Sequence, residues 1–246
     1  IAWEHFNFYE NNGSSLRALA RKIDGRFSDY IITLTEEDKN NYLNNLKIKG
    51  KIDYIYNPME SKKSGNCNIN SKQIVSVGRL TYQKGFDILI DVANDVLKKN
   101  PDYKWLILGD GEDKEKLENK IKEYNLEERL ILKGKVSNVE DYYKNSALYV
   151  MTSRFEGLPM TLLEAKNFKL PIVSFDCQTG PSEIIRNNIN GYLVKANDTK
   201  GMTNKVNSLL KDNEKLKEFS DKAELDIDKF NLVSITNKWT KILSTI

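Results

Sequence analysis

Short apolar runs alternate with amphipathic stretches over most of the 246-residue chain. From residue 74 onward, six runs of strand-forming residues recur, and helical apolar spacing follows most of them. The runs are Ile74–Val77, Trp105–Leu108, Leu130–Leu132, Ala147–Met151, Pro171–Phe175 and Gly191–Val194. This alternation predicts an α/β fold with a doubly wound, parallel six-stranded sheet that helices cover on both faces.

Helices are predicted between these strands and after the last one. Their ranges are Phe86–Lys99, Lys114–Tyr124, Val139–Asn145, a helix opened by Pro159, Pro181–Asn187, and helices across 199–226. A final helix, Val233–Leu243, carries Ile235, Trp239 and Ile242 on one side. Because no strand follows it, we expect this helix to cover a surface elsewhere in the molecule.

The first 57 residues predict part of a second α/β domain. An amphipathic helix comes first, with strands at Tyr30–Leu34 and Ile52–Tyr56 and, between them, a helix capped by Thr35. The apolar residues of the first helix are Leu16, Leu19, Ala20, Ile23 and Phe27, and its basic residues are Arg17, Arg21 and Lys22. The apolar face is expected to cover a core; the alternative is that the helix rests on anionic lipid.

The predicted domain boundaries follow from these patterns. Residues 1–57 form the partial domain, and the polar, turn-rich residues 58–72 form a linker. Residues 73–230 form the larger domain, and the final helix lies in 231–246.

Composition excludes several functional classes. The 38 basic and 35 acidic side chains leave a net charge of +3, which does not indicate a nucleic-acid surface. Two distant cysteines and one histidine exclude a disulfide framework and a multi-histidine metal site, and fit a reducing, cytoplasmic compartment. No apolar run is long enough to cross a membrane.

Two glutamates near one helix start form the first candidate site. In the segment Ser153–Ala165, Glu156 lies in a loop and Glu164 lies in the helix that Pro159 opens. A helix start has unpaired amides and attracts anions. The free donors expected here are the amides of Met160, Thr161 and Leu162. The alternative is that one glutamate caps the helix and the other is solvated.

Two cations after the first long strand form the second candidate site. Gly78, Arg79 and Lys84 lie where that strand ends, at the sheet edge where doubly wound folds bind ligands. Arg offers a planar fork and Lys a point charge to phosphate oxygens, so together they could balance a diphosphate. The alternative is that both are ordinary surface charges.

Two further motifs are weaker. The segment Gly109-Asp110-Gly111 resembles the start of a dinucleotide fingerprint, but Lys114 stands where the third glycine would be, so an NAD-linked oxidoreductase is disfavoured. Asp226-Ile227-Asp228 has the spacing of a divalent-metal motif but lies among predicted helices instead of after a strand.

Taken together in their order, these motifs resemble the retaining family-4 glycosyltransferases of the GT-B fold. The segment Thr179–Glu183 completes the set. The resemblance implies that residues 73 to about 230 are the Rossmann-like, nucleotide-sugar-binding domain, with the final helix crossing back to the N-terminal part. Residues 1–57 then resemble only the end of the acceptor-binding domain, and inactivity of this chain by itself is an open alternative.

The resemblance also implies a role for each candidate residue. Gly78, Arg79 and Lys84, with the amides of Met160, Thr161 and Leu162, would hold the donor diphosphate. Glu164 would bind the ribose, and Lys135 and Val136 the base. Glu156 with Gly157 and Leu158 would contact the transferred sugar, and His5 would face it across the cleft, although a histidine beside Trp3 and Phe6 can equally be a packed one. No metal or other cofactor is expected.

The opening Trp3–Asn7 and the segment Phe175–Pro181 look most like bacterial enzymes of capsular or exopolysaccharide synthesis. This implies a UDP-sugar donor and a saccharide or lipid-linked acceptor at the cytoplasmic membrane face, where the first helix could make peripheral contact. A non-catalytic sugar-nucleotide binding module is the alternative function.

Overall fold

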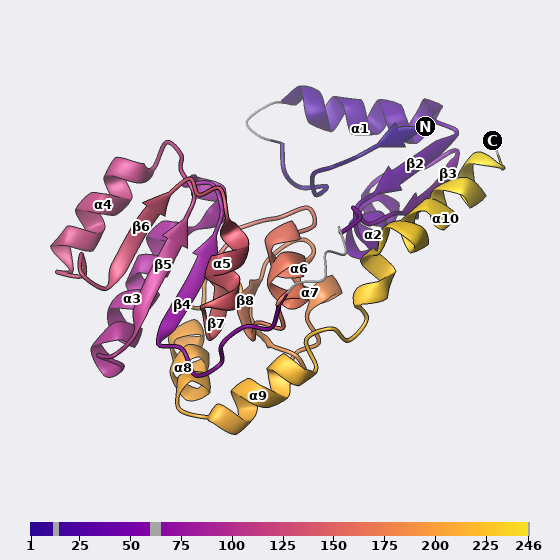
Figure 1. Cartoon of the computed structure of the whole chain (residues 1–246). Helices are drawn as coiled ribbons and strands as arrows, with labels where there is room; N and C mark the ends of the chain where they lie inside the picture. Colours follow the sequence, from indigo (N-terminus) through magenta and orange to yellow (C-terminus); the bar gives the residue numbers. More distant parts are fainter. Residues whose placement is uncertain (12–14, 60–64, 246) are drawn as a thin grey trace.

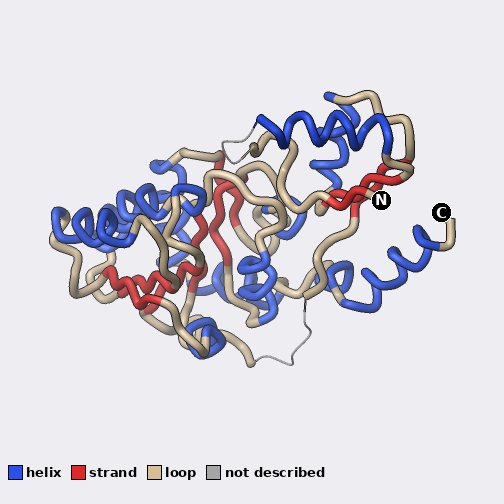
Figure 2. The backbone as a smooth tube through the Cα atoms, turned by 90° about the horizontal axis from the view of Figure 1, so that it is seen from above, coloured by secondary structure: helices blue, strands red, loops and turns tan. Residues whose placement is uncertain are grey.

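The computed structural model of the chain describes residues 1–11, 15–59 and 65–245. Two parallel sheets form its centre, one with six strands and one with three (Figure 1). Seen from above, the small sheet with the last helix lies at one end of the molecule and the large sheet at the other (Figure 2). Part of the predicted linker 58–72, residues 60–64, lies outside the described residues.

The large sheet confirms the doubly wound parallel architecture. Its strand order is β6-β5-β4-β7-β8-β9, so the chain first builds outward on one side of β4 and then returns to build on the other. All neighbouring strands are parallel. The strands are β4 (Gln73–Val77), β5 (Lys104–Leu108), β6 (Leu130–Gly134), β7 (Leu148–Met151), β8 (Ile172–Asp176) and β9 (Tyr192–Lys195).

Residues that alternate along these strands enter two separate cores, one on each face of the sheet. Ile74 packs on the face covered by α3 (Phe86–Lys99), α4 (Lys114–Glu123), α8 (Thr199–Leu210) and α9 (Asn213–Asp221). Val75 packs on the opposite face, which α5 (Val139–Lys144), α6 (Met160–Asn167) and α7 (Pro181–Ile184) cover. Because helices cover both faces, most residues in the middle of the strands are apolar, and no alternating polar pattern is needed.

The helix boundaries differ from expectation mainly at α7. This helix ends at Ile184 and not at Asn187, because Ile185 adopts an extended backbone. Short 3-10 turns at Tyr82–Lys84 and Ile227–Phe230 were not predicted.

The small sheet has the order β1-β2-β3, with β1 (Ala2–Trp3), β2 (Tyr30–Thr33) and β3 (Lys51–Tyr54). Its edge strand β1 was not predicted, because two residues carry no periodic signal. The predicted cap of α2 (Glu36–Asn45) is present, with the Thr35 hydroxyl accepting from the Asp38 amide at 3.1 Å. The final helix, α10 (Leu232–Leu243), contacts this sheet through Trp239, whose ring centroid lies 5.1 Å from that of Trp3.

Helix α1 (Ser15–Phe27) corrects one expectation. Its apolar side chains do not cover a core: Leu16 is 72% exposed, Leu19 53%, Ile23 48% and Phe27 74%. Arg21, from the polar side, is instead buried and donates to the carbonyls of Glu10 and Asn7. Within the described residues, α1 is therefore attached by its polar side and presents its apolar side to solvent.

Candidate active site

A cavity of about 550 Å³ opens at the carboxyl ends of β4, β5 and β6. The strand order reverses next to β4, and the carboxyl edge at such a reversal is where open α/β sheets bind ligands. Among the residues that line the cavity, six were candidates from the sequence: Gly78, Arg79, Lys135, Val136, Thr161 and Glu164.

The floor of the cavity depends on a glycine contact between two strands. Gly109 has a φ of 139°, and a Cβ there would lie 1.8 Å from the carbonyl oxygen of Gly78. Only glycine allows this approach of β5 to β4. Gly109 therefore shapes this edge of the sheet.

Lys84 and Glu156 form an ion pair beside the cavity. The Nζ of Lys84 lies 2.7 Å from Oε1 of Glu156, and both side chains are largely buried, at 17% and 5% exposed. The stem of Lys84 runs over Gly78, where a Cβ would lie 3.2 Å from its Cγ. Lys84, a candidate for diphosphate binding, is thus paired with Glu156, a candidate for sugar binding, and neither residue lines the cavity.

The start of α6 corrects one of the three predicted amide donors. Pro159 precedes the helix as its cap, and its carbonyl accepts from the Leu162 amide at 3.0 Å. Leu162 is consequently not a free donor, because the first turn closes on Pro159. Among the described residues, no hydrogen bond occupies the amides of Met160 and Thr161, so these two remain available.

Glu164 lies between the cavity and a smaller hollow of about 320 Å³ lined by Met160. Burial raises the pKa of the Glu164 carboxyl, and a hydrogen bond from the Tyr143 hydroxyl, at 2.8 Å, lowers it. Sequence reasoning missed Tyr143, because nothing in the pattern of α5 indicates that one of its core residues reaches a carboxylate of α6.

The loop between β7 and α6, which carries Glu156 and Gly157, lies against the first residues of the chain. A Cβ on Gly157 would lie 2.6 Å from the carbonyl oxygen of His5, so this contact requires glycine. The neighbouring Leu158 is buried. The His5 ring is exposed and packs on Trp3, with centroids 4.3 Å apart. The backbone of His5 contacts the loop at Gly157, and its ring packs on Trp3. A packed histidine was the alternative to one that faces the sugar.

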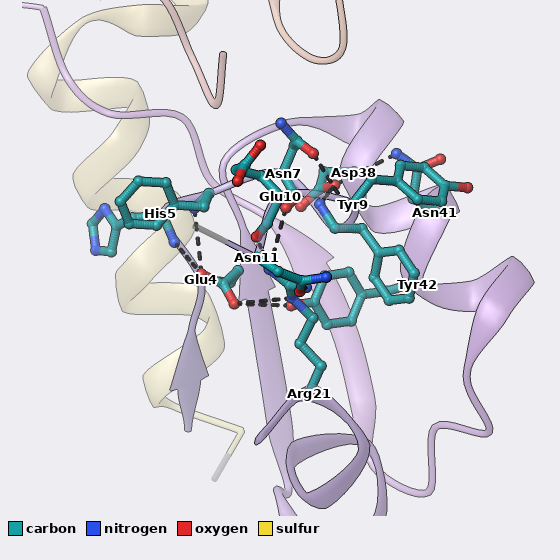
Figure 3. A network of polar contacts seen from close by, with 12 residues as sticks. Glu4, His5, Asn7, Tyr9, Glu10, Asn11, Arg21, Asp38, Asn41 and Tyr42 are labelled. Carbon is teal, nitrogen blue, oxygen red and sulfur yellow. Dashed lines mark hydrogen bonds and ion pairs between the residues drawn. The ribbon is translucent and has the colours of Figure 1, made fainter. Parts of the chain in front are cut away.

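Asn7 is a second residue that the sequence analysis missed. Its side-chain amide donates to the carbonyls of Glu156, at 3.1 Å, and Gln178, at 3.4 Å. Figure 3 shows Asn7 within a polar network that includes Glu4, Arg21 and Asp38. This network connects the small sheet to the loop that carries Glu156.

Glu183, from the Thr179–Glu183 motif, makes a further connection to the small sheet. Its carboxylate accepts from the Tyr56 hydroxyl at 2.6 Å and from the Glu37 amide, in the first turn of α2, at 3.1 Å. Burial, followed by the nearby carboxylates of Asp176 and Glu183, raises the pKa of the Glu37 side chain. The motif therefore joins the two parts of the molecule.

The described residues contain no cluster of three or more His, Cys, Asp or Glu side chains that could hold a metal ion. In the Asp226-Ile227-Asp228 motif, Asp226 pairs with Arg186 at 2.5 Å. None of the helices in the described ranges is sufficiently long and apolar to cross a membrane.

Comparison with known families gives one family match. The family described as "Glycosyl transferases group 1" matches residues 59–226. Amylovoran biosynthesis glycosyltransferase AmsD of Erwinia amylovora is 36% identical over 223 residues, which cover 88% of this chain and 62% of that protein. Poly(ribitol-phosphate) alpha-N-acetylglucosaminyltransferase of Staphylococcus aureus is 32% identical and is matched over 92% of this chain and 45% of its own length.

Solved structures agree with this match. A crystal structure of a S. aureus TarM mutant in complex with fondaparinux, alpha-GlcNAc-glycerol and UDP superposes with a TM-score of 0.89 at 29% identity, covering 97% of this chain and 49% of TarM. Anabaena Alr3699/HepE superposes with a TM-score of 0.86 at 19% identity, covering 98% of this chain and 71% of HepE, a likeness that concerns the fold alone. The chain spans 62% of AmsD and about half of TarM.

Proposed function

The chain belongs to the glycosyl transferases group 1 family, and from this premise we propose that it carries the donor half of a retaining hexosyltransferase. The donor is a nucleotide-diphosphate sugar, with UDP as the nucleotide, and the acceptor is a growing surface polysaccharide, lipid-linked in the cell. The single observation that supports this most is the cavity that unites Arg79, Thr161 and Glu164 at the sheet edge.

Each part of the donor has a matching group. The guanidinium of Arg79 and the free amides of Met160 and Thr161 bind the diphosphate, and Glu164 accepts from the ribose hydroxyls. The base lies against Lys135 and Val136. Glu156, Gly157 and Leu158 contact the transferred sugar, and His5, whose backbone touches Gly157, faces the sugar from the other side.

Positive charge near the diphosphate assists the departure of the sugar. As the bond to the sugar breaks, negative charge grows on the diphosphate, and Arg79 with Lys84 stabilises it. The leaving phosphate takes the proton of the acceptor hydroxyl. Lys84 is already held 2.7 Å from Glu156, so diphosphate and sugar binding would act on one ion pair. These cations are proposed to balance the diphosphate without a metal ion.

The names of the similar proteins support the finer parts of the proposal. The S. aureus relative is named an alpha-N-acetylglucosaminyltransferase, and the TarM structure contains UDP. UDP-hexoses usually carry their sugar in α-linkage, so an α-linked product corresponds to retention. The polysaccharide acceptor follows the names of the amylovoran and poly(ribitol-phosphate) enzymes.

The test is calorimetric titration of the chain with UDP. Arg79→Ala and Lys84→Ala should each weaken binding by about tenfold or more, because a charge-assisted hydrogen bond contributes roughly 1.5–3 kcal/mol. Lys133→Ala is the matched control, an exposed cation on β6 outside the cavity lining. EDTA should leave the affinity unchanged. Equal affinity in all variants would reject the phosphate assignment.

We further propose that residues 1–57 are the end of an acceptor-binding domain, followed by the linker 58–72 and the donor domain 73–230. The open edge of β1 and the uncovered apolar side of α1 support this. A non-catalytic binding module is the alternative, since the chain spans 62% of AmsD. Release of UDP from a UDP-sugar by this chain, with an acceptor present, would exclude that alternative.

A further inference from the structure

Tyr143 holds one oxygen of Glu164. Its hydroxyl lies 2.8 Å from Oε2 of the carboxylate, and the tyrosine itself is completely buried in α5. The ring packs between Tyr149 and Phe168, with centroids 6.1 Å and 5.4 Å away. A side chain fixed on both sides has one position for its hydroxyl, so the direction of this hydrogen bond is fixed as well.

A second buried tyrosine supports the neighbouring residue of the same helix. Tyr149, in β7, hydrogen-bonds with Thr161, and its hydroxyl also donates to the carbonyl oxygen of Val77 at 3.3 Å. Thr161 and Glu164 are one helical turn apart in α6, and both line the cavity. Each tyrosine therefore hydrogen-bonds to an α6 residue that lines the cavity, Tyr143 to Glu164 and Tyr149 to Thr161.

We propose that Tyr143 is a positioning residue of the donor site, which fixes the carboxylate plane of Glu164 so that its remaining acceptor positions face the ribose. This rests on the donor site proposed above. A carboxylate has about four acceptor positions, and a tyrosine hydroxyl occupies one of them. The two vicinal ribose hydroxyls can donate to the remaining acceptor positions at the same time only if the carboxylate does not rotate.

The bond also maintains the charge of Glu164. Burial raises the pKa of the carboxyl, and the Tyr143 hydroxyl lowers it, so loss of the hydroxyl should raise it further. Burial raises the pKa of Tyr143 well above its ordinary value, so at neutral pH its hydroxyl remains a donor. The other ionisable groups that face this carboxylate or its two cavities are Arg79, Asp110, Lys135, Glu140 and Tyr149.

The experiment compares Tyr143→Phe with wild type for binding of UDP and 2′,3′-dideoxy-UDP, which lacks both ribose hydroxyls. Tyr143→Phe should weaken UDP binding by about tenfold and change the dideoxy affinity less than about twofold, because that ligand does not use Glu164. Tyr124→Phe is the matched control: it removes a hydroxyl that donates to the carboxylate of Asp91 at 2.8 Å, and neither residue lines the donor cavity or the smaller hollow.

Two further readouts distinguish positioning from simple packing. In Tyr143→Phe, the acidic limb of UDP binding should move to higher pH, because Glu164 gains a proton more easily. In a Glu164→Gln background, adding Tyr143→Phe should cause little further loss, because the residue acts through the carboxylate. Thermal unfolding of each variant checks that it is folded.

The outcomes separate this inference from the proposed function. If wild type does not bind UDP, the donor assignment fails and this role fails with it. If wild type prefers UDP over the dideoxy form and Tyr143→Phe keeps that preference, only the positioning role is wrong. If Tyr143→Phe weakens binding of both ligands equally, Tyr143 is a packing residue, and the positioning role is wrong.

Discussion

Lys166 is a buried cation that the proposed reaction does not use. It is 1% exposed, and its Nζ donates to the carbonyls of Ile184, at 2.8 Å, and Leu225, at 3.1 Å. Burial, and then the nearby charges of Lys229 and Arg186, lower its pKa to about 8, while Asp226 acts in the opposite direction. The side chain joins α6 to the end of α7 and to the turn that follows α9.

This shift predicts how stability depends on pH. Between about pH 8 and 10.5 the folded chain binds fewer protons at Lys166 than the unfolded chain, so the free energy of unfolding should rise with pH. Relative to Lys166→Met, which lacks the titrating group, the rise should be on the order of 3 kcal/mol across this window. Urea titrations from pH 7 to 11 measure it, with the exposed Lys98→Met as control. Parallel curves for wild type and Lys166→Met would contradict the prediction.

Which single residues form the site could be predicted only in part. Arg79, Thr161 and Glu164 meet because each lies just beyond or beside a strand end, and strand ends are readable from apolar runs. Tyr143 and Asn7 were missed because they act by hydrogen bonds across long stretches of chain, and no local pattern encodes such a partner. Leu162 was misassigned because the sequence does not tell whether Pro159 caps the helix or begins it.

The secondary elements were more predictable than the site. All six strands of the large sheet were predicted, because burial on both faces makes them short apolar runs between helices of clear periodicity. Strand β1 was missed, and the packing of α1 was wrong, because amphipathic spacing indicates which side of a helix is apolar but not what covers it.

The contact between the β7–α6 loop and the first segment predicts a steric effect. Gly157→Ala would place a methyl group 2.6 Å from the His5 carbonyl, so the segments must separate. The cost should be roughly 1–3 kcal/mol of unfolding free energy, as for other overpacked sites. Gly65→Ala is the control, because its methyl would lie 3.4 Å from the flexible end of Lys144. Chemical denaturation measures both, and equal stabilities would show that the contact yields freely.

In the whole molecule, the two sheets are joined by polar contacts and by the final helix. Asn7 and Glu183 connect the small sheet to the loops at the carboxyl edge of the large one, and α10 extends from the large domain onto β1 and β3. Figure 1 shows α10 beside β3. The apolar side of α1 is exposed to solvent, whereas its Arg21 donates to the segment that carries Asn7.

Exposed apolar surface of this kind predicts association. The isolated chain should form larger species as its concentration rises, and the double variant Leu16→Glu with Phe27→Glu should remain monomeric in sedimentation experiments. Leu232→Glu with Val233→Glu, exposed residues at the start of α10, is the matched control. Loss of binding to anionic vesicles in the α1 variant, with wild type monomeric at all concentrations, would instead favour the peripheral membrane contact.

The meeting of Trp3 and Trp239 gives the protein an internal optical reporter. The chain has three tryptophans, and these two touch across its first strand and last helix, while Trp105 is sealed in the core with its indole N–H donating to Ser76 at 3.0 Å. Near-ultraviolet circular dichroism from the touching pair therefore reports undocking of the last helix, and emission from Trp105 reports loss of the core of the large sheet. The two signals are dominated by different parts of the molecule and need no added label.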